Sequence, residues 1–172
     1  MKEKITDALE IERKYIIKMP SISILEEQDR HTASDILQIY LPSESGETRR
    51  VRRRSFSDRV EYIETKKIRV DSMSSREIER EIDESEFNLF AENPLEGTKP
   101  ILKTRHTFVF LGQLFEIDIY PEWQNTAIME TELPSRETQI EIPPFLEIIR
   151  EVTGIKAYSN AGMSRGFPDE EM

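Results

Sequence analysis

The feature that most constrains the fold of this sequence is an alternation of period two in which charged residues recur on one side of each segment. Successive side chains of a β-strand point to opposite faces of a sheet, so this alternation predicts strands rather than helices. Turn signals rich in Pro, Gly, Ser and Asp separate the segments. The predicted strands lie at about residues 10–18, 35–42, 47–54, 59–68, 76–83, 101–111, 113–120 and 126–133.

Two other segments have helical spacing. Phe87 and Phe90 lie three residues apart within Glu84 to Glu92, and residues 143–152 begin with a proline and stop before Gly154. Eight strands with two or three helices predict a mainly β (α+β) fold, an eight-stranded antiparallel β-barrel or tunnel with the helices outside.

The chain shows no internal repeat and no low-complexity linker. We therefore expect one domain over residues 1–172, with its core at about 8–165. The acidic end, residues 166–172, is expected to be a solvated, frayed tail.

The polar faces of the predicted strands carry like charges two residues apart. Taken singly, each such strand would fit a solvated outer face with weak cross-strand ion pairs. A surface built for ion pairs would mix its signs more finely, whereas segregated pairs suit a site where an anion meets the basic strands and a cation meets the acidic ones. Unpaired buried charges cost several kcal/mol each. The pattern therefore predicts a water-filled tunnel or a polar binding site instead of a dry core.

Composition narrows the partners. The 172 residues include 24 Lys and Arg against 34 Asp and Glu, a net charge of −10, which argues against a general binder of nucleic acids or anionic membranes. There is no cysteine and there are only two histidines, so any metal would be held by carboxylates, which favours hard ions such as Mg²⁺, Mn²⁺ or Ca²⁺. No apolar run approaches the ~20 residues of a membrane span, and the first residues lack the apolar stretch of a signal peptide. We expect a soluble, cytoplasmic protein with no membrane partner.

Along the chain, the like-charged pairs form an ordered series of motifs. The series is Glu10-Ile11-Glu12-Arg13-Lys14 (ExExK), Arg50-Val51-Arg52 (RxR), Thr65-Lys66-Lys67 (TxK), Glu79-Arg80-Glu81 (ExE), Lys103-Thr104-Arg105 (KxR), Phe115-Glu116-Ile117-Asp118 and Glu130-Thr131-Glu132 (ExE). In its order and spacing it resembles the CYTH, or triphosphate tunnel metalloenzyme, superfamily over about residues 8–165.

The resemblance implies a tunnel that binds a triphosphate along its axis with Mg²⁺ or Mn²⁺. On charge chemistry, the bases expected against the triphosphate are Arg50, Arg52, Lys67, Lys103 and Arg105. The carboxylates expected to hold one or two metals are Glu10, Glu12, Glu130 and Glu132. Those expected to complete the metal shell or fix the basic side chains are Glu79, Glu81, Glu116 and Asp118. Lys14, Glu12 and Glu130 are the predicted catalytic residues, with Lys14 binding phosphate or, with a depressed pKa, assisting the attacking water.

The function expected from this resemblance is a divalent-metal-dependent triphosphatase that hydrolyses inorganic tripolyphosphate or a small organic triphosphate by in-line attack of water. One alternative is a class IV adenylate cyclase converting ATP to cyclic AMP and pyrophosphate, although no sequence feature demands a purine pocket. Another is a catalytically weak polyphosphate- or nucleotide-binding module, against which the intact acidic motifs count. The expected partner is a small triphosphate and no long nucleic acid, and both a monomer and a homodimer stay open.

Two registers also stay open. The run from Arg49 to Arg54 permits Arg52 with Arg54 in place of Arg50 with Arg52, and a one-residue slip would exchange Lys66 for Lys67. His106 falls on the face opposite Lys103 and Arg105, which favours a packed histidine over a catalytic one.

Overall fold

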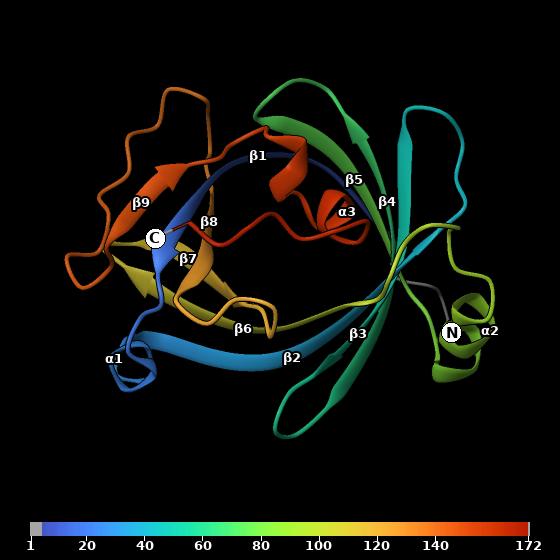
Figure 1. The fold of residues 1–172 in the computed structure, drawn as a ribbon, viewed down its shortest axis with the longest axis horizontal. Coiled ribbons are helices and arrows are strands. Elements are labelled where there is room, and N and C mark those ends of the chain that lie inside the picture. The colour runs from blue at the N-terminus through green and yellow to red at the C-terminus, as the bar shows by residue number, and fades with distance from the viewer. Residues whose placement is uncertain (1–4, 172) are drawn as a thin grey trace.

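The computed structural model describes residues 5–171, and within them eight strands close into an antiparallel barrel (Figure 1). The strands are β1 (Ile5–Lys18), β2 (Asp29–Leu41), β3 (Glu47–Ser55), β4 (Val60–Arg69), β5 (Ser74–Glu81), β6 (Ile101–Phe110), β7 (Gln113–Ile119) and β8 (Thr126–Glu132). The predicted barrel and its eight strands are confirmed. No helix in this part of the chain is long and apolar enough to cross a membrane.

The barrel closes because β1 is long enough to pair on both of its edges. One edge runs along β8, and the other pairs with β5 from Ile5 to Ile11. Beyond Ile11 that second edge passes to a short ninth strand, β9 (Ile148–Glu151), which pairs with β1 at Tyr15 to Ile17. The strand order is therefore β5-β4-β3-β2-β6-β7-β8-β1, with β9 alongside β1.

The helix expected at residues 143–152 is wrong. Its apolar residues fit a helical face, but two of them, Ile148 and Ile149, are β-branched and lie in β9. The edge of β1 that β5 leaves unpaired supplies backbone hydrogen-bonding groups for β9, so long-range pairing overrides the local helical spacing. The other predicted helix is confirmed as α2 (Glu84–Ala91), which begins at a capping box formed by Asp83 and Glu86.

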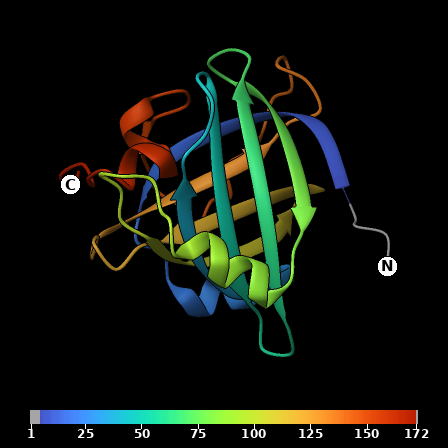
Figure 2. The same ribbon diagram turned by 90° about the vertical axis from the view of Figure 1, so that its right-hand side faces the viewer.

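Two apolar cores lie outside the ring of strands. The first packs outward residues of β1, β6, β7 and β8 beneath α1 (Ile22–Glu26), whose Leu25 is fully buried, and beneath Leu146. The second packs outward residues of β2 and β3 against Phe87 of α2. Figure 2 shows β3, β4 and β5 side by side with α2 outside them. With its apolar faces turned outward onto helices and loops, the barrel turns its charged faces inward.

The barrel interior changes character along its length. At one end its inward side chains are apolar and pack against the C-terminal segment, which contains the short helices η1 (Lys156–Tyr158) and α3 (Asn160–Met163) and lies across the opening in Figure 1. The inward residues of this third core are Ile16, Tyr40, Ile101, Tyr120 and Ile128. The C-terminal segment therefore closes one end of the tunnel.

The prediction of a frayed tail at residues 166–172 is wrong for residues 166–171. Met172 lies outside the described residues. Trp123 donates a hydrogen bond from Nε1 to the carbonyl of Pro168 at 3.1 Å, and Phe167 packs edge-on against the same ring. The Glu170 carboxylate accepts hydrogen bonds from the backbone N–H groups of Asn125 and Thr126. These acidic residues satisfy donors on the barrel, and the chain end holds the closing segment in place.

Candidate functional site

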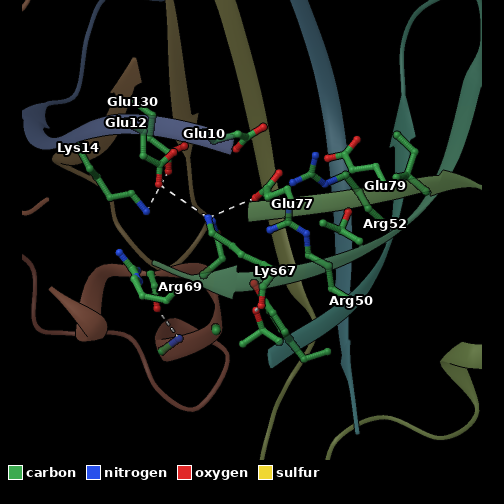
Figure 3. A pocket seen from close by; sticks show the side chains of 18 of the residues that line it. Glu10, Glu12, Lys14, Arg50, Arg52, Lys67, Arg69, Glu77, Glu79 and Glu130 are labelled. Carbon is green, nitrogen blue, oxygen red and sulfur yellow. Dashed lines mark hydrogen bonds and ion pairs between the residues drawn. The ribbon is translucent and has the colours of Figure 1, made fainter. Parts of the chain in front are cut away.

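The inward charges of the strands line a cavity of about 860 Å³ inside the barrel. All eight strands of the barrel contribute to its walls, chiefly β1, β3, β4, β5 and β8, and residues of η1 and α3 complete one side. Figure 3 shows basic side chains of β3 and β4 across from acidic side chains of β1 and β8. Alternation along each strand brings these residues together, because every second side chain faces inward.

One side of the cavity is an arginine wall, formed by Arg50, Arg52 and Arg54 of β3. Arg52 donates from Nε and Nη2 to Oε1 of Gln38 at 3.0 and 2.8 Å. Arg54 donates from Nε to the hydroxyl of Ser34 at 2.8 Å. Within residues 5–171 none of the three arginines forms an ion pair with a carboxylate. Burial lowers the pKa of Arg50, but Tyr40 and the charges of Glu77 and Glu79 of β5 outweigh it and raise the pKa overall.

Arg50 also has a buried donor that makes no hydrogen bond. Its Nε is buried without a hydrogen-bond partner, and so is the hydroxyl of Thr65, its direct neighbour across the β3–β4 pair. Buried polar atoms are nearly always hydrogen-bonded in folded proteins. Both atoms belong to residues that line the cavity, where a bound ligand or water would satisfy them.

Across the cavity lies an acidic wall, formed by Glu10 and Glu12 of β1 and Glu132 of β8. Glu12 stands directly opposite Glu132 in the β1–β8 pair, and like charges in such positions destabilise a sheet. Partial compensation comes from Lys67 of β4, whose Nζ lies 3.9 Å from Glu12 and 3.2 Å from Glu77 of β5.

The pKa values of this wall show its excess of negative charge. Burial and the nearby carboxylates of Glu77 and Glu132 raise the pKa of Glu10 to about 9. Burial and Glu130 raise the pKa of Glu12, and burial, Glu116 and Glu12 raise that of Glu132. Each shift means that ionising the wall costs free energy while no cation is bound.

Oxygen donors gathered in this way fit a hard divalent cation in chemical type. Within the described chain, however, no three such side chains are drawn together closely enough to hold a metal ion. The predicted quartet Glu10, Glu12, Glu130 and Glu132 therefore lines one cavity without forming a finished coordination shell.

Next to the cavity, two buried bases have carboxylate partners. Nη1 of Arg105 lies 2.5 Å from the carboxylate of Glu116. Asp118 of β7 accepts from Nε and Nη2 of Arg105 at 2.7 and 2.8 Å and from Nζ of Lys103 at 2.7 Å. The side chains of Asp118 and Lys103 are both completely buried. We call Lys103, Arg105 and Asp118 the buried trio.

Comparison with known proteins finds similarity to solved structures. No protein-family model matches this sequence, and no curated protein matches it. The crystal structure of the inorganic triphosphatase NE1496 superposes with a TM-score of 0.59 and 26% identity, covering 92% of this chain and 96% of that chain. The chain belongs to the CYTH, or triphosphate tunnel metalloenzyme, superfamily.

More distant structures share only the fold of the superfamily. The PH1012 protein of Pyrococcus horikoshii OT3 has a TM-score of 0.55 and 18% identity, covering 74% of this chain and 81% of that chain. A conserved hypothetical protein of Pyrococcus furiosus has a TM-score of 0.53 and 20% identity, covering 74% and 80%.

Most residues matched to superfamily motifs face the cavity. Those that line it are Glu10, Glu12, Lys14, Arg50, Arg52, Lys67, Glu79, Arg105, Glu116, Glu130 and Glu132. The open registers are resolved, because Lys66 is exposed and Arg54 joins Arg50 and Arg52 on one face. His106 lies on the outer face, 2.9 Å from His31 between ring nitrogens.

Three expected site residues lie elsewhere. Glu81 is exposed at the end of β5 and does not line the cavity. Lys103 and Asp118 face inward but are sealed within the buried trio, so Lys103 does not reach the cavity surface as a phosphate ligand. Instead, Lys103 and Asp118 fix Arg105, which does line it.

The pKa of Lys14 agrees with one of its two expected roles, the binding of phosphate, and disagrees with the other. Burial lowers its pKa, but the charges of Glu130, 3.0 Å from Nζ, and of Glu12 outweigh burial and raise the pKa overall. Lys14 therefore stays an ammonium at neutral pH, which suits binding of phosphate and does not suit the role of a base.

Several lining residues were missed. Glu77 is the most consequential, since it is buried and pairs with Lys67; it lies two residues before Glu79, so the alternation already contained it. Arg69 follows Lys67 by two residues in the same way. Lys156 and Asn160 belong to the closing segment and share no strand pattern with the motifs, so no sequence signal marked them.

Proposed function

We propose that this protein is a divalent-metal-dependent triphosphatase that hydrolyses inorganic tripolyphosphate or a small organic triphosphate. The observation that carries the proposal is the separation of charge in one cavity. An arginine wall without carboxylate partners faces an acidic wall without sufficient cations. A polyanion together with a metal ion supplies both missing charges.

The arginine wall favours an extended anion. Alternate residues of a strand lie about 7 Å apart, so the three arginines of β3 cover roughly 13 Å. Guanidinium groups donate in pairs to phosphate oxygens. A chain of linked phosphates uses such a row better than a single phosphate does.

The acidic wall fits the metal that the superfamily implies. Glu10, Glu12 and Glu132 would hold a hard cation such as Mg²⁺ or Mn²⁺, which neutralises phosphate charge and lowers the pKa of a bound water. Lys14, held as an ammonium by Glu130, adds a fixed positive charge beside them.

In the proposed reaction, the oxygen of a water forms a bond to the terminal phosphorus while the bridging P–O bond on the opposite side breaks. For tripolyphosphate, the products are orthophosphate and pyrophosphate, and the proton of the water passes to a carboxylate of the acidic wall. The arginine wall holds the chain in line and balances its charge, which is the main protein contribution to phosphoryl transfer.

The relative supports this choice among activities. The structure that matches over nearly the whole of both chains is named an inorganic triphosphatase. No separate apolar pocket within the lining of the cavity marks a place for a base, since the lining is dominated by charged side chains.

The test is a product assay on the purified full chain. We would supply tripolyphosphate, thiamine triphosphate or ATP with Mg²⁺ or Mn²⁺ and measure orthophosphate, pyrophosphate and cyclic AMP. Metal-dependent orthophosphate release is expected. Cyclic AMP with pyrophosphate from ATP would replace the proposal with a cyclase, and tight binding without turnover would replace it with a binding module.

A further inference from the structure

We infer that Gln38 of β2 is a positioning residue, which holds Arg52 against the cavity and leaves the charge of its guanidinium free for the bound anion. The inference rests on the proposed function and extends the site to a residue that does not line the cavity. It concerns the amide of Gln38, which is neutral where a carboxylate would fit.

The contact is built into the barrel. Gln38 pairs with Arg52 in the β2–β3 register, and its side chain is completely buried. Its Oε1 takes one donor from Nε and one from Nη2, at 3.0 and 2.8 Å. A guanidinium has five N–H donors. Within the described chain no other side chain accepts from Arg52, so three donors stay free.

The buried trio shows the alternative arrangement. Arg105 also donates through Nε and Nη2, at 2.7 and 2.8 Å, but its acceptor is the carboxylate of Asp118. Both arginines donate through Nε and Nη2, but Arg105 donates to a carboxylate and has a second carboxylate, Glu116, 2.5 Å from Nη1, whereas Arg52 donates to a neutral amide. Arg105 is compensated by its partner, whereas Arg52 is not.

Leaving Arg52 uncompensated has a cost in the ligand-free protein. Burial and the positive charges of Arg50 and Arg105 lower the pKa of Arg52 to about 9, so it stays charged at neutral pH but under strain from its neighbours. A carboxylate in place of the amide would relieve this strain and weaken the attraction of the wall for an anion.

The same arrangement recurs along β2. Ser34 accepts from Arg54, and Tyr40 lies opposite Arg50 in the β2–β3 register. One strand therefore supports two of the three arginines with neutral oxygens. This repetition indicates that neutral support is a property of the wall and not of one side chain.

The test is the substitution Gln38→Glu, which keeps the size and the acceptor and changes only the charge. Binding of inorganic tripolyphosphate is measured by calorimetry in EDTA, so that no metal contributes. We expect Kd to rise about tenfold or more, since one charge beside the ligand is cancelled. With metal, KM should rise similarly while kcat changes less. Gln124→Glu, on an exposed loop, is the control for net charge and should bind like wild type.

The outcomes separate the inference from the proposed function. If wild-type protein binds no tripolyphosphate, the proposed function falls and the inference falls with it. If wild type binds and Gln38→Glu binds equally well, the inference alone is overturned, because an acceptor of either charge then suffices.

A second variant distinguishes an effect of the added charge from an effect of the lost hydrogen bonds. Gln38→Met removes the acceptor without adding charge, and the charge explanation predicts that it weakens binding less than Gln38→Glu does. A purely structural role of the hydrogen bonds predicts the reverse order. The melting temperature of ligand-free Gln38→Glu should equal or exceed that of wild type, and failure of this variant to fold would contradict the inference.

Discussion

The arginine wall and the buried trio contain the same kinds of side chain in opposite states. In the trio, the completely buried Asp118 accepts hydrogen bonds from Lys103 and Arg105 at 2.7–2.8 Å, and Glu116 supplies a second carboxylate 2.5 Å from Arg105. In the wall, Arg52 and Arg54 are held by neutral oxygens of β2, and all three arginines line the cavity. The first arrangement is complete as it stands, and the second is complete only with an anion.

The comparison shows how to distinguish structural from functional charges inside a barrel. Buried charges stabilise a fold when each has its partner, and removing one partner is then costly. Charges whose partners are absent lower stability and are retained for what they bind. Substitutions in the trio should therefore change stability first, and substitutions in the two walls should change binding and turnover first.

The largest expected effect is on stability, from Asp118→Asn. The variant leaves buried Lys103 without its ion-pair partner and Arg105 with only Glu116 and the more distant Glu130, which should lower the free energy of unfolding by about 3–5 kcal/mol. Urea denaturation would measure it. Asp58→Asn is the matched control, because Asp58 is 73% exposed in its pair with Arg59 and should cost less than about 1 kcal/mol. Equal losses in both variants would remove the distinction between trio and surface.

The sequence predicts which face a residue occupies better than how deep along the barrel it lies. Alternation correctly turned Lys103 and Glu81 to the inner face, because parity is a local property of a strand. Their depth depends on the stagger between strands and on what fills each end. The C-terminal segment seals the end where Lys103 lies, and Glu81 lies beyond the cavity.

Long-range pairing explains the other misses. Residues 143–152 have helical spacing, and only the unpaired edge of β1 makes Ile148–Glu151 a strand. Gln38 appears in the sequence as one polar residue in an apolar strand. Its relation to Arg52 arises from the β2–β3 register, which alternation within one strand does not contain.

The next largest effect is expected on turnover, from Glu12→Gln in the acidic wall. Loss of a carboxylate that would hold the metal should lower metal-dependent kcat at least about a hundredfold, or about 2.7 kcal/mol in activation free energy. Because Glu130 and burial raise the pKa of Glu12, the neutral variant should be no less stable than wild type. Steady-state kinetics and a thermal melt test the two parts.

For Glu12→Gln the control is Glu27→Gln, which changes an exposed carboxylate outside the barrel. Retention of most activity in the Glu12 variant would rule out the proposed metal-holding role of the acidic wall. Loss of activity together with loss of folding would place Glu12 with the trio instead.

A smaller effect is expected on substrate binding, from Arg52→Ala in the arginine wall. Hydrogen bonds to charged groups contribute about 1.5–3 kcal/mol, so KM should rise about 10- to 100-fold. The neighbouring residue gives the control: Arg53 is exposed on the opposite face of β3, and Arg53→Ala should leave KM unchanged. An unchanged KM in Arg52→Ala would show that the wall does not bind the substrate.

The smallest effect is a pH dependence that belongs to the acidic wall alone. Burial with Glu77 and Glu132 raises the pKa of Glu10 from 4.5 to about 9, so between these values the folded protein keeps a proton that the unfolded chain has lost. The unfolding free energy therefore falls as pH rises through this range. Burial lowers the pKa of Lys103 to about 7, and burial and His31 lower that of His106; both shifts act in the opposite direction. The contribution of Glu10 is therefore the difference between wild type and Glu10→Gln in melts in EDTA from pH 5 to 7. As the pH rises from 5 to 7, the fall in melting temperature should be about 2–4 °C smaller for Glu10→Gln than for wild type.

Millimolar Mg²⁺ should reduce this difference between the two proteins, because it compensates the charge of the wild-type carboxylates. Parallel pH profiles with and without the Glu10 carboxylate would mean that the wall carries no excess charge, and its contrast with the compensated trio would disappear.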